Sequence, residues 1–256
     1  MGNITYLLGA GASFGKRDEN KPILERQTSI RNNNLTKTSY KYANITEGLP
    51  LVTEIPGRLA FVIDKIKYNP YPPQTRKLIF SSESLGNINF DKAKDMLISD
   101  LEWLKNASEN HATIDTFAKK LYLKGQLNEF YKVETLLSIF FIIEQTINKI
   151  DGRYDTFLAS ILNNQLNIDD RITILTWNYD SQFEIAYKEY GTQKEASSIR
   201  SKLGIADLKD QSYETRNQIF KLNGSANFMS QIDLSSYNHF DDTLLIKLLD
   251  IYKWIK

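Results

Sequence analysis

Three short clusters of small and polar residues carry the groups that could do chemistry, and each directly follows an apolar segment. They are Gly9-Ala10-Gly11-Ala12-Ser13, Thr176-Trp177-Asn178-Tyr179-Asp180 and Asn223-Gly224-Ser225. An apolar run that stops at such a cluster is typical of a buried strand that ends in a ligand-facing loop. Because ligands of open α/β sheets bind beyond the carboxyl ends of the strands, we expect the three clusters to meet at one crevice.

The first cluster has the composition of a phosphate-binding loop. Gly9 and Gly11 let the backbone approach an anion closely, and the free N–H groups of a following helix would point at that anion. The spacing resembles the dinucleotide pattern G-x-G-x-x-G, with Gly15 one place late. The alternative is a tight strand-to-helix turn in which glycine is needed only for packing.

The second cluster offers an amide and a carboxylate. The amide of Asn178 can both donate and accept, which suits a carboxamide, a ribose hydroxyl or an attacking water. Asp180 adds a further acceptor on the same turn. The alternative is structural, with Asn178 as a turn residue and Asp180 as the N-cap of the next helix.

Composition excludes several classes of protein. The 256 residues include no cysteine, so disulfide scaffolds, thiolate zinc sites, iron–sulfur clusters and cysteine nucleophiles are ruled out. With 32 basic and 31 acidic residues, no global field attracts nucleic acid, and direct nucleic-acid binding is not expected. No apolar run approaches the ~20 residues of a membrane span, and the first residues do not read as an export signal. We expect a cytoplasmic protein without a membrane partner.

The elements that must position these clusters alternate between strands and helices. Strands are predicted at Ile4–Leu8, Ile172–Leu175 and Gln218–Leu222. Helical spacing covers residues 55–66, 93–104, a segment from Thr113, Leu127–Ile150, residues 157–162, a segment from Phe183, and Thr243–Lys256. The polar stretch Lys16–Glu47 is either a mobile functional lid or disordered.

This order predicts an α/β fold, with a Rossmann-like parallel sheet, helices on both faces and a helical insertion. We expect one domain over residues 1–256. Its Rossmann-like parts would cover about 1–50 and 168–256, and the mainly helical insertion about 51–167.

Taken together, the clusters resemble the sirtuin family. The residues from Gly9 to Ser13 match its G-A-G-x-S loop, Gly48-Leu49-Pro50 matches its G-x-P step, and Thr176 to Asp180 match its T-x-N-x-D motif. Leu222-Asn223-Gly224-Ser225 occupies the place of its L-H-G motif. The sequence is most similar to the sirtuin-like effectors of bacterial antiphage defence, which also carry a segment like Thr113-Ile114-Asp115-Thr116-Phe117.

The resemblance implies a site for NAD as substrate, with no metal. It assigns the phosphates to the glycine loop, and the nicotinamide and its ribose to Asn178 and Asp180, with Pro50, Thr176, Trp177, Gly224 and Ser225 also at the site. In the defence effectors NAD is hydrolysed to nicotinamide and ADP-ribose, which starves an infected cell. Self-association and an ATPase or Argonaute-like partner belong to the same expectation. The absence of cysteine removes the zinc module of typical sirtuin deacylases.

The chain departs from the family pattern in two places. Asn223 stands where the family has its catalytic histidine, and an amide cannot exchange a proton near neutral pH as imidazole does. The expected activity is therefore either attenuated or absent, which leaves a silent NAD- or ADP-ribose-binding or assembly module as the alternative. His111 and His239, the two histidines of the chain, read as surface residues. No glycine follows Gly224, so the chain is either a fragment or closes its site differently.

A more general nucleotide-binding α/β protein is the third interpretation.

Overall fold

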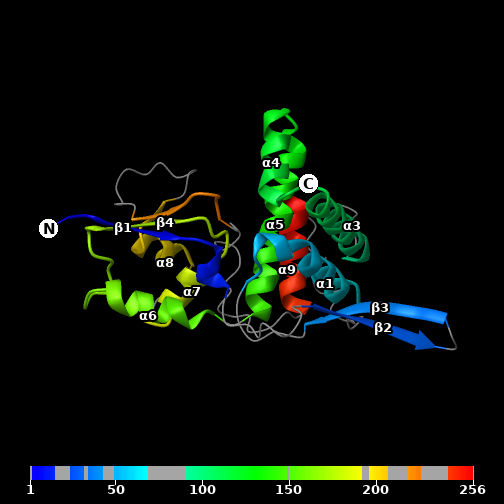
Figure 1. Cartoon of the computed structure of the whole chain (residues 1–256), viewed down its shortest axis with the longest axis horizontal. Coiled ribbons are helices and arrows are strands. Elements are labelled where there is room, and N and C mark those ends of the chain that lie inside the picture. Colours follow the sequence, from blue (N-terminus) through cyan, green and yellow to red (C-terminus); the bar gives the residue numbers. More distant parts are fainter. Residues whose placement is uncertain are drawn as a thin grey trace. The chain divides into compact units, whose positions relative to one another are not determined.

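The computed structural model describes residues 2–14, 24–31, 34–42, 49–68, 90–148, 150–191, 196–206, 218–225 and 242–255. This part of the protein is a mixed α/β structure that divides into two compact units. Unit 1 holds a four-stranded sheet with three helices, and unit 2 holds further helices and a two-stranded sheet (Figure 1). The predicted α/β class is confirmed at this level.

The sheet of unit 1 is parallel, as predicted. Its strands are β1 (Ile4–Leu8), β4 (Ile172–Thr176), β6 (Ile219–Lys221) and β5 (Ile205–Ala206), in the spatial order β1-β4-β6-β5. Tyr6 pairs with Ile174, and Leu175 pairs with Phe220. Every neighbouring pair runs in the same direction. The carboxyl ends of β1, β4 and β6 therefore lie side by side.

Three helices lie on one face of this sheet (Figure 1). They are α6 (Gly152–Ile161), α7 (Gln182–Lys188) and α8 (Ala196–Lys202). The core between sheet and helices includes Leu158, Ile174, Phe183, Leu203 and Ile219. On the other face Leu7 is 58% exposed and Phe220 36% exposed. In the described residues, then, the expected helices on the second face are not found.

The prediction that Ile4–Leu8 is a buried strand is wrong. In the described sheet β1 lies at the edge and pairs only with β4. Tyr6 and Leu8 pack against the core, whereas Ile4 is 49% exposed. An edge strand with one covered face buries only alternate side chains, whatever their hydrophobicity.

Unit 2 contains the helices that apolar periodicity predicts. They are α1 (Ile55–Tyr68), α3 (Phe90–Glu109), α4 (Ile114–Leu123), the first part of α5 (Leu127–Ile147) and α9 (Asp242–Ile255). Thr113 caps α4 by accepting a hydrogen bond from the N–H of Thr116 at 3.1 Å. Pro56 occupies the first turn of α1, where its missing N–H costs nothing.

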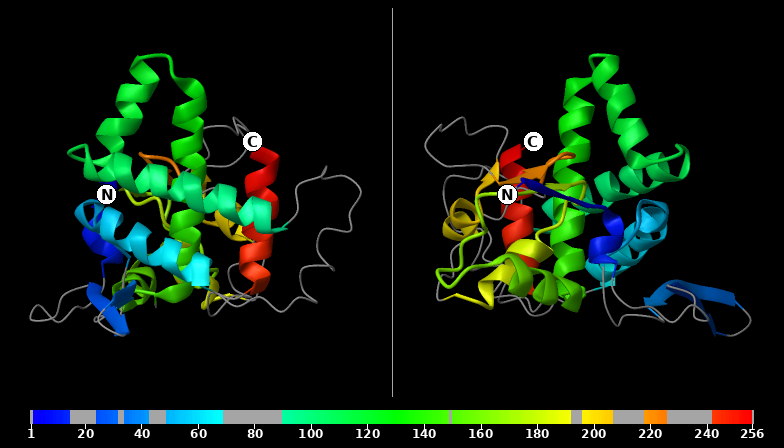
Figure 2. Two further views of the ribbon diagram at one scale, coloured as in Figure 1. Left: turned by 90° about the vertical axis from the view of Figure 1, so that its right-hand side faces the viewer. Right: turned by 60° about the vertical axis from the view of Figure 1, so that its left-hand side comes forward.

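Helices α4 and α5 form a hairpin (Figure 2). Gly125 turns the chain between them with φ +69°, a conformation that side chains rarely adopt. The predicted end of α5 at Ile150 is three residues too late. At the end of the helix, the carbonyl of Glu144 accepts both the N–H of Asn148 at 3.0 Å and its side-chain amide at 2.7 Å.

The interpretation of Lys16–Glu47 as a lid or disordered segment is wrong for part of its length. Leu24–Arg31 (β2) and Asn34–Tyr42 (β3) form an antiparallel pair with Arg31 opposite Asn34. β2 contains threonine and isoleucine, β3 contains threonine and tyrosine, and two residues separate the strands, a length that favours hairpins. Polar composition hid this β preference. The rest of the stretch lies outside the described residues.

Other elements were not predicted. α8 and β5 lie in the polar stretch Thr192–Asn217, α6 begins five residues before Phe157, and two 3₁₀ turns, η1 (Ala10–Ser13) and η2 (Val52–Glu54), follow strand or loop segments. The boundaries of the units also differ from the expected insertion of 51–167. Residues 141–167 belong to unit 1, and α9 belongs to unit 2.

A buried polar contact links α3, α5 and α9 in unit 2. The hydroxyl of Tyr252 donates to the carboxylate of Asp100, which also forms an ion pair of 2.7 Å with Lys132. The ammonium of Lys132 lies 4.4 Å from the ring centre of Trp103. Burial and the neighbouring carboxylate raise the pKa of Tyr252, so the hydroxyl keeps its proton.

We expect Tyr252→Phe to lower the free energy of unfolding by about 1.5–3 kcal/mol, because a hydrogen bond to a charged acceptor is lost in the core. Urea denaturation measures the loss. Tyr131→Phe is the control, since Tyr131 is 53% exposed, and its effect should stay within about 0.5 kcal/mol. Equal effects of the two variants would contradict the importance of the contact.

Candidate functional site

The three clusters lie side by side at the carboxyl ends of neighbouring parallel strands, as predicted. The N–H of Trp177 donates to the carbonyl of Leu8 at 3.2 Å, which joins the ends of β1 and β4. The N–H of Leu222 donates to the carbonyl of Thr176 at 2.8 Å, which joins the ends of β4 and β6. Parallel pairing thus brings segments from three parts of the sequence to one place.

The glycine loop is a single 3₁₀ turn in the described residues, rather than the start of the expected longer helix. The N–H of Ala12 donates to the carbonyl of Gly9 at 2.9 Å, and Gly9, Ala10 and Gly11 are exposed. A Cβ added to Gly9 or Gly11 would meet no described atom within 4 Å. Packing against the described residues therefore does not explain these glycines, and no described atom occupies the space in front of them.

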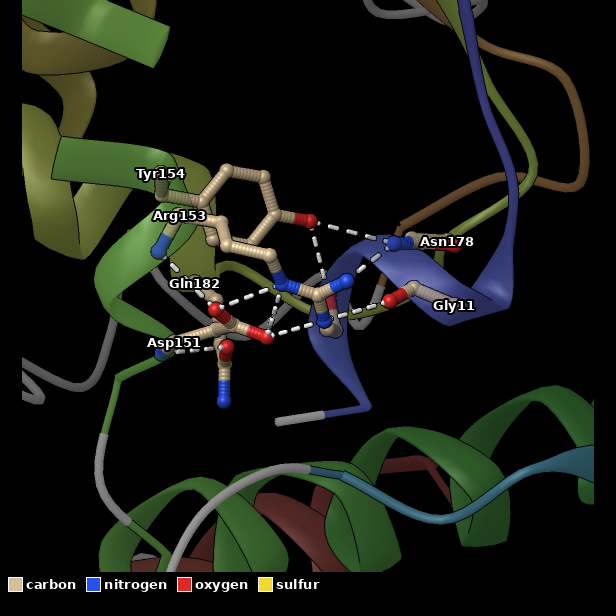
Figure 3. A network of polar contacts seen from close by, with 7 residues as sticks. Gly11, Asp151, Arg153, Tyr154, Asn178 and Gln182 are labelled. Atoms are coloured by element: carbon tan, nitrogen blue, oxygen red, sulfur yellow. Dashed lines mark hydrogen bonds and ion pairs between the residues drawn. The ribbon is translucent and has the colours of Figure 1, made fainter. Parts of the chain in front are cut away.

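Ser13, Tyr154 and Asn178 form a closed triangle of hydrogen bonds (Figure 3). The amide nitrogen of Asn178 donates to the hydroxyl oxygens of Ser13 and Tyr154 at 2.9 and 3.1 Å. The two hydroxyl oxygens are 2.7 Å apart. All three side chains are buried. Two of them lie in the predicted clusters, whereas Tyr154 comes from α6.

The first turn of α6 is tied to both neighbouring loops (Figure 3). Asp151 caps the helix and forms an ion pair with Arg153. The guanidinium of Arg153 also donates to the carbonyl of Gly11 at 2.7 Å, and the N–H of Asp151 donates to the side chain of Gln182 at 3.2 Å. Tyr154, which follows directly, is thereby held against Ser13 and Asn178.

Asp180 is buried, and the buried charged side chains of Lys221 and Glu184 lie close to it. The carboxylate of Asp180 accepts the N–H of Gln182 at 3.0 Å. The N-cap of α7 is Ser181, so the alternative in which Asp180 is the N-cap is wrong by one residue. Lys221 donates to the backbone carbonyl of Asp180 and forms an ion pair of 2.7 Å with Glu184. Arg200 pairs with the same Glu184 at 3.3 Å. Burial raises the pKa of Asp180, and attraction to Lys221 opposes that shift.

The structure also places Thr176, Trp177 and Pro50, which the resemblance assigns to the site. The hydroxyl of Thr176 accepts the N–H of Asn178 at 3.1 Å, which fixes the turn at the end of β4. Trp177 is 46% exposed beside it. The buried Pro50 follows Leu49, whose N–H donates to the carbonyl of Ser13 at 2.6 Å.

The third cluster follows β6, at the same end of the sheet. The amide of Asn223 donates to the carbonyl of Trp177 at 3.4 Å, and the side chain is exposed. Gly224 has φ +86°, which favours glycine, and Ser225 is half-buried. Asn223 thus contacts the backbone of the residue that precedes Asn178.

The contacts of His111 are local to α3 and α4. Its Nδ1 donates to the carbonyl of Ala107 at 2.8 Å, and its ring packs on that of Phe117. His239 and Gly48 lie outside the described residues.

A small cavity lies beneath the triangle, lined by residues that include Tyr154, Thr176, Asn178, Asp180 and Glu184. Two buried oxygens of its lining residues, Oδ1 of Asn178 and Oε2 of Glu184, have no hydrogen-bond partner in the described part of the chain. Both can only accept, so the chemistry offered here is that of acceptors awaiting a donor.

Sequence reasoning missed Tyr154, Arg153, Glu184 and Lys221. Asp151 carried a signal, because aspartate before a helix is a common N-cap and would have moved the start of α6. Lys221 carried another, because it shares the core-facing side of β6 with Ile219. Tyr154 had no such signal, since spacing alone does not reveal its partners.

We compared the chain with protein-family models, with characterised proteins and with solved structures, and none of them matches it.

No group of three or more His, Cys, Asp or Glu side chains among the described residues could hold a metal ion, and the expectation of a metal-free reaction stays a prediction. None of the described helices is both long enough and apolar enough to cross a membrane.

We expect Lys221→Met to lower the free energy of unfolding by about 3 kcal/mol, because Glu184 would stay buried without its nearest cation. Arg200 keeps the loss at the low end of the usual range. Adding Glu184→Gln should restore at least half of it. Urea denaturation measures both, with the exposed Lys202→Met as control. A loss below 1 kcal/mol, or no recovery in the double variant, would contradict the assignment.

The raised pKa of Asp180 predicts a pH dependence with a defined sign. The folded chain binds this proton more tightly than the unfolded chain, whose carboxyl titrates near 3.8. Stability from Asp180 is therefore present below that pH and is lost as the pH rises through the folded pKa. Asp180→Asn removes the effect and keeps an acceptor for Gln182.

We expect Asp180→Asn to gain stability relative to the unmodified protein as the pH rises from about 4 to 7, measured by urea denaturation. Asp169→Asn is the control, because Arg171 lowers the pKa of Asp169 below its unfolded value of 3.8; its contribution is then nearly complete above about pH 4, and the difference should stay almost constant over this range. A pH-independent difference for Asp180→Asn would show that this carboxyl titrates alike in both states.

Proposed function

We propose that the chain is a sirtuin-like NAD hydrolase domain with a Rossmann-like sheet, acting in bacterial antiphage defence by abortive infection. The proposal starts from the sequence resemblance. Its main structural support is one observation: the three motif-bearing loops end adjacent parallel strands, and Ser13 of the first is hydrogen-bonded to Asn178 of the second. This is the arrangement in which an α/β sheet binds a nucleotide.

The glycine loop fits the phosphate half of such a substrate. Gly9 and Gly11 are exposed, and no described atom fills the place of their missing side chains. The phosphate groups of a ligand need such a close approach to the protein backbone. Trp177, half-exposed at the neighbouring strand end, offers a flat apolar surface to a ring of the ligand.

The reaction proposed is the breaking of the bond between nicotinamide and ribose. Nicotinamide leaves as a neutral base, an oxocarbenium-like ribose forms, and water adds to the same carbon and releases a proton, which gives ADP-ribose. Asn178 would orient the water or a ribose hydroxyl through its amide, and Asp180 would support the loop.

Asn223 limits this chemistry. An amide does not take up a proton near neutral pH, so a step that needs a general base should slow by ~10²–10⁴-fold relative to a histidine enzyme. Binding should be less affected, because position 223 lies at the exposed rim. A silent NAD- or ADP-ribose-binding or assembly module is therefore the second candidate, and Asn223 is the observation that favours it.

Self-association and an ATPase or Argonaute-like partner are part of the proposal. They rest on the family resemblance alone.

The experiment is NAD consumption with nicotinamide release, measured for the unmodified protein and for Asn223→His in parallel. We expect NAD binding by calorimetry in both and faster cleavage by Asn223→His, by ~10²-fold or more. Gly11→Ala should weaken binding without loss of stability, because its Cβ enters the ligand's space. Gly2→Ala is the matched control, since its Cβ also meets nothing within 4 Å.

Each outcome decides between the candidates. Binding by both forms with cleavage by neither would leave the binding module. Absence of NAD binding in both forms would overturn the proposed function.

A further inference from the structure

Tyr154 belongs to none of the sequence motifs, is 4% exposed and is one of the three corners of the triangle. Its hydroxyl accepts from the amide of Asn178 at 3.1 Å and lies 2.7 Å from the hydroxyl oxygen of Ser13. Its ring packs edge-on against Phe183, with ring centres 5.7 Å apart. The hydroxyl thus touches both loops that carry the proposed site.

The amide nitrogen of Asn178 donates to the hydroxyls of Ser13 and Tyr154. These hydroxyls also bond to each other, and either of them can be the donor. Burial and the charge of Asp180 raise the pKa of Tyr154, so its hydroxyl keeps its proton.

These hydrogen bonds determine which atom of the Asn178 amide is left to bind a ligand. The nitrogen of Asn178 is fully used, whereas Oδ1 has no partner in the described part of the chain. An amide held through its nitrogen can offer only its oxygen. The residue therefore presents an acceptor, which suits a hydroxyl group or a water and not a carbonyl oxygen.

The position of Tyr154 is itself fixed by neighbouring contacts. Arg153 bonds to the carbonyl of Gly11, and the N–H of Asp151 bonds to Gln182 at the start of α7 (Figure 3). The first turn of α6 is therefore held at the glycine loop and at the loop after β4 together. A hydroxyl in that turn can set the geometry of both loops.

We propose that Tyr154 is a positioning residue that, with Ser13, locks the Asn178 amide so that its oxygen faces a hydroxyl or water of the substrate. This inference deepens the proposed function and rests on it for the identity of the ligand. The lock itself is a property of the protein alone. It can therefore be tested with and without NAD.

The first measurement follows the side-chain amide of Asn178 by NMR in protein labelled with ¹⁵N-asparagine. Its signal is assigned by its loss in Asn178→Asp. In the unmodified protein we expect two resolved amide protons that exchange slowly with water, because both are bonded and buried. In Tyr154→Phe exchange should become at least about tenfold faster, while the ring still packs on Phe183.

Tyr187→Phe is the matched control. Tyr187 is equally buried in unit 1 and donates its hydroxyl to the carbonyl of Leu166 at 2.7 Å, away from the triangle. It loses one buried hydroxyl without touching Asn178. A general loss of stability would affect the amide in both variants, whereas a positioning role affects it in Tyr154→Phe alone.

The second measurement is NAD affinity by calorimetry. We expect about tenfold weaker binding by Tyr154→Phe, and less than twofold weakening by Tyr187→Phe. An unchanged Asn178 signal in Tyr154→Phe overturns the lock, whatever the affinity. A loosened amide with unchanged affinity overturns its role in binding. If the unmodified protein binds no NAD, the proposed function fails, and amide exchange alone decides whether Tyr154 locks Asn178.

Discussion

The parallel pairing of β1 with β4 is the constraint on which unit 1 depends. It sets Leu8 opposite Thr176, so the loops that follow these strands start side by side. From that starting point the side chain of Ser13 reaches Asn178, although 165 residues separate them in the sequence. Without this register the small and polar residues of the two loops would have no common environment.

Buried polar side chains that pair with one another hold the loops of the site. The triangle of Ser13, Tyr154 and Asn178 satisfies most of its hydrogen-bonding capacity internally. Beneath it, Lys221 neutralises Glu184 and bonds to the carbonyl of Asp180. Buried polar groups are costly unless they are paired, so this network fixes one arrangement of the loops and disfavours others. Preorganisation of that kind serves ligand binding whether or not chemistry follows.

The sequence allowed the strand ends to be predicted, and with them most of the residues that meet at the site. Apolar runs that stop at glycine or asparagine mark Ser13 and Asn178 without any structure. Tyr154 was out of reach, because helical spacing tells which face of α6 is buried and not which atoms it meets. The exposure of β1 was also misjudged, since hydrophobicity does not reveal how many neighbours a strand has. The strands β2 and β3 were hidden because their polar side chains mask a backbone preference for extended structure.

The distance along the chain between the partners of the β1–β4 pair also bears on how the protein folds. Helices such as α3 and α4 form from residues near one another, whereas β1 has no described partner until β4, far along the chain, is available. Contacts between distant segments require closure of a long loop and slow the folding rate. On a ribosome, β1 would emerge before β4 and would lack this partner until β4 is synthesised. The loops of the site would then be among the last parts of unit 1 to take their final form.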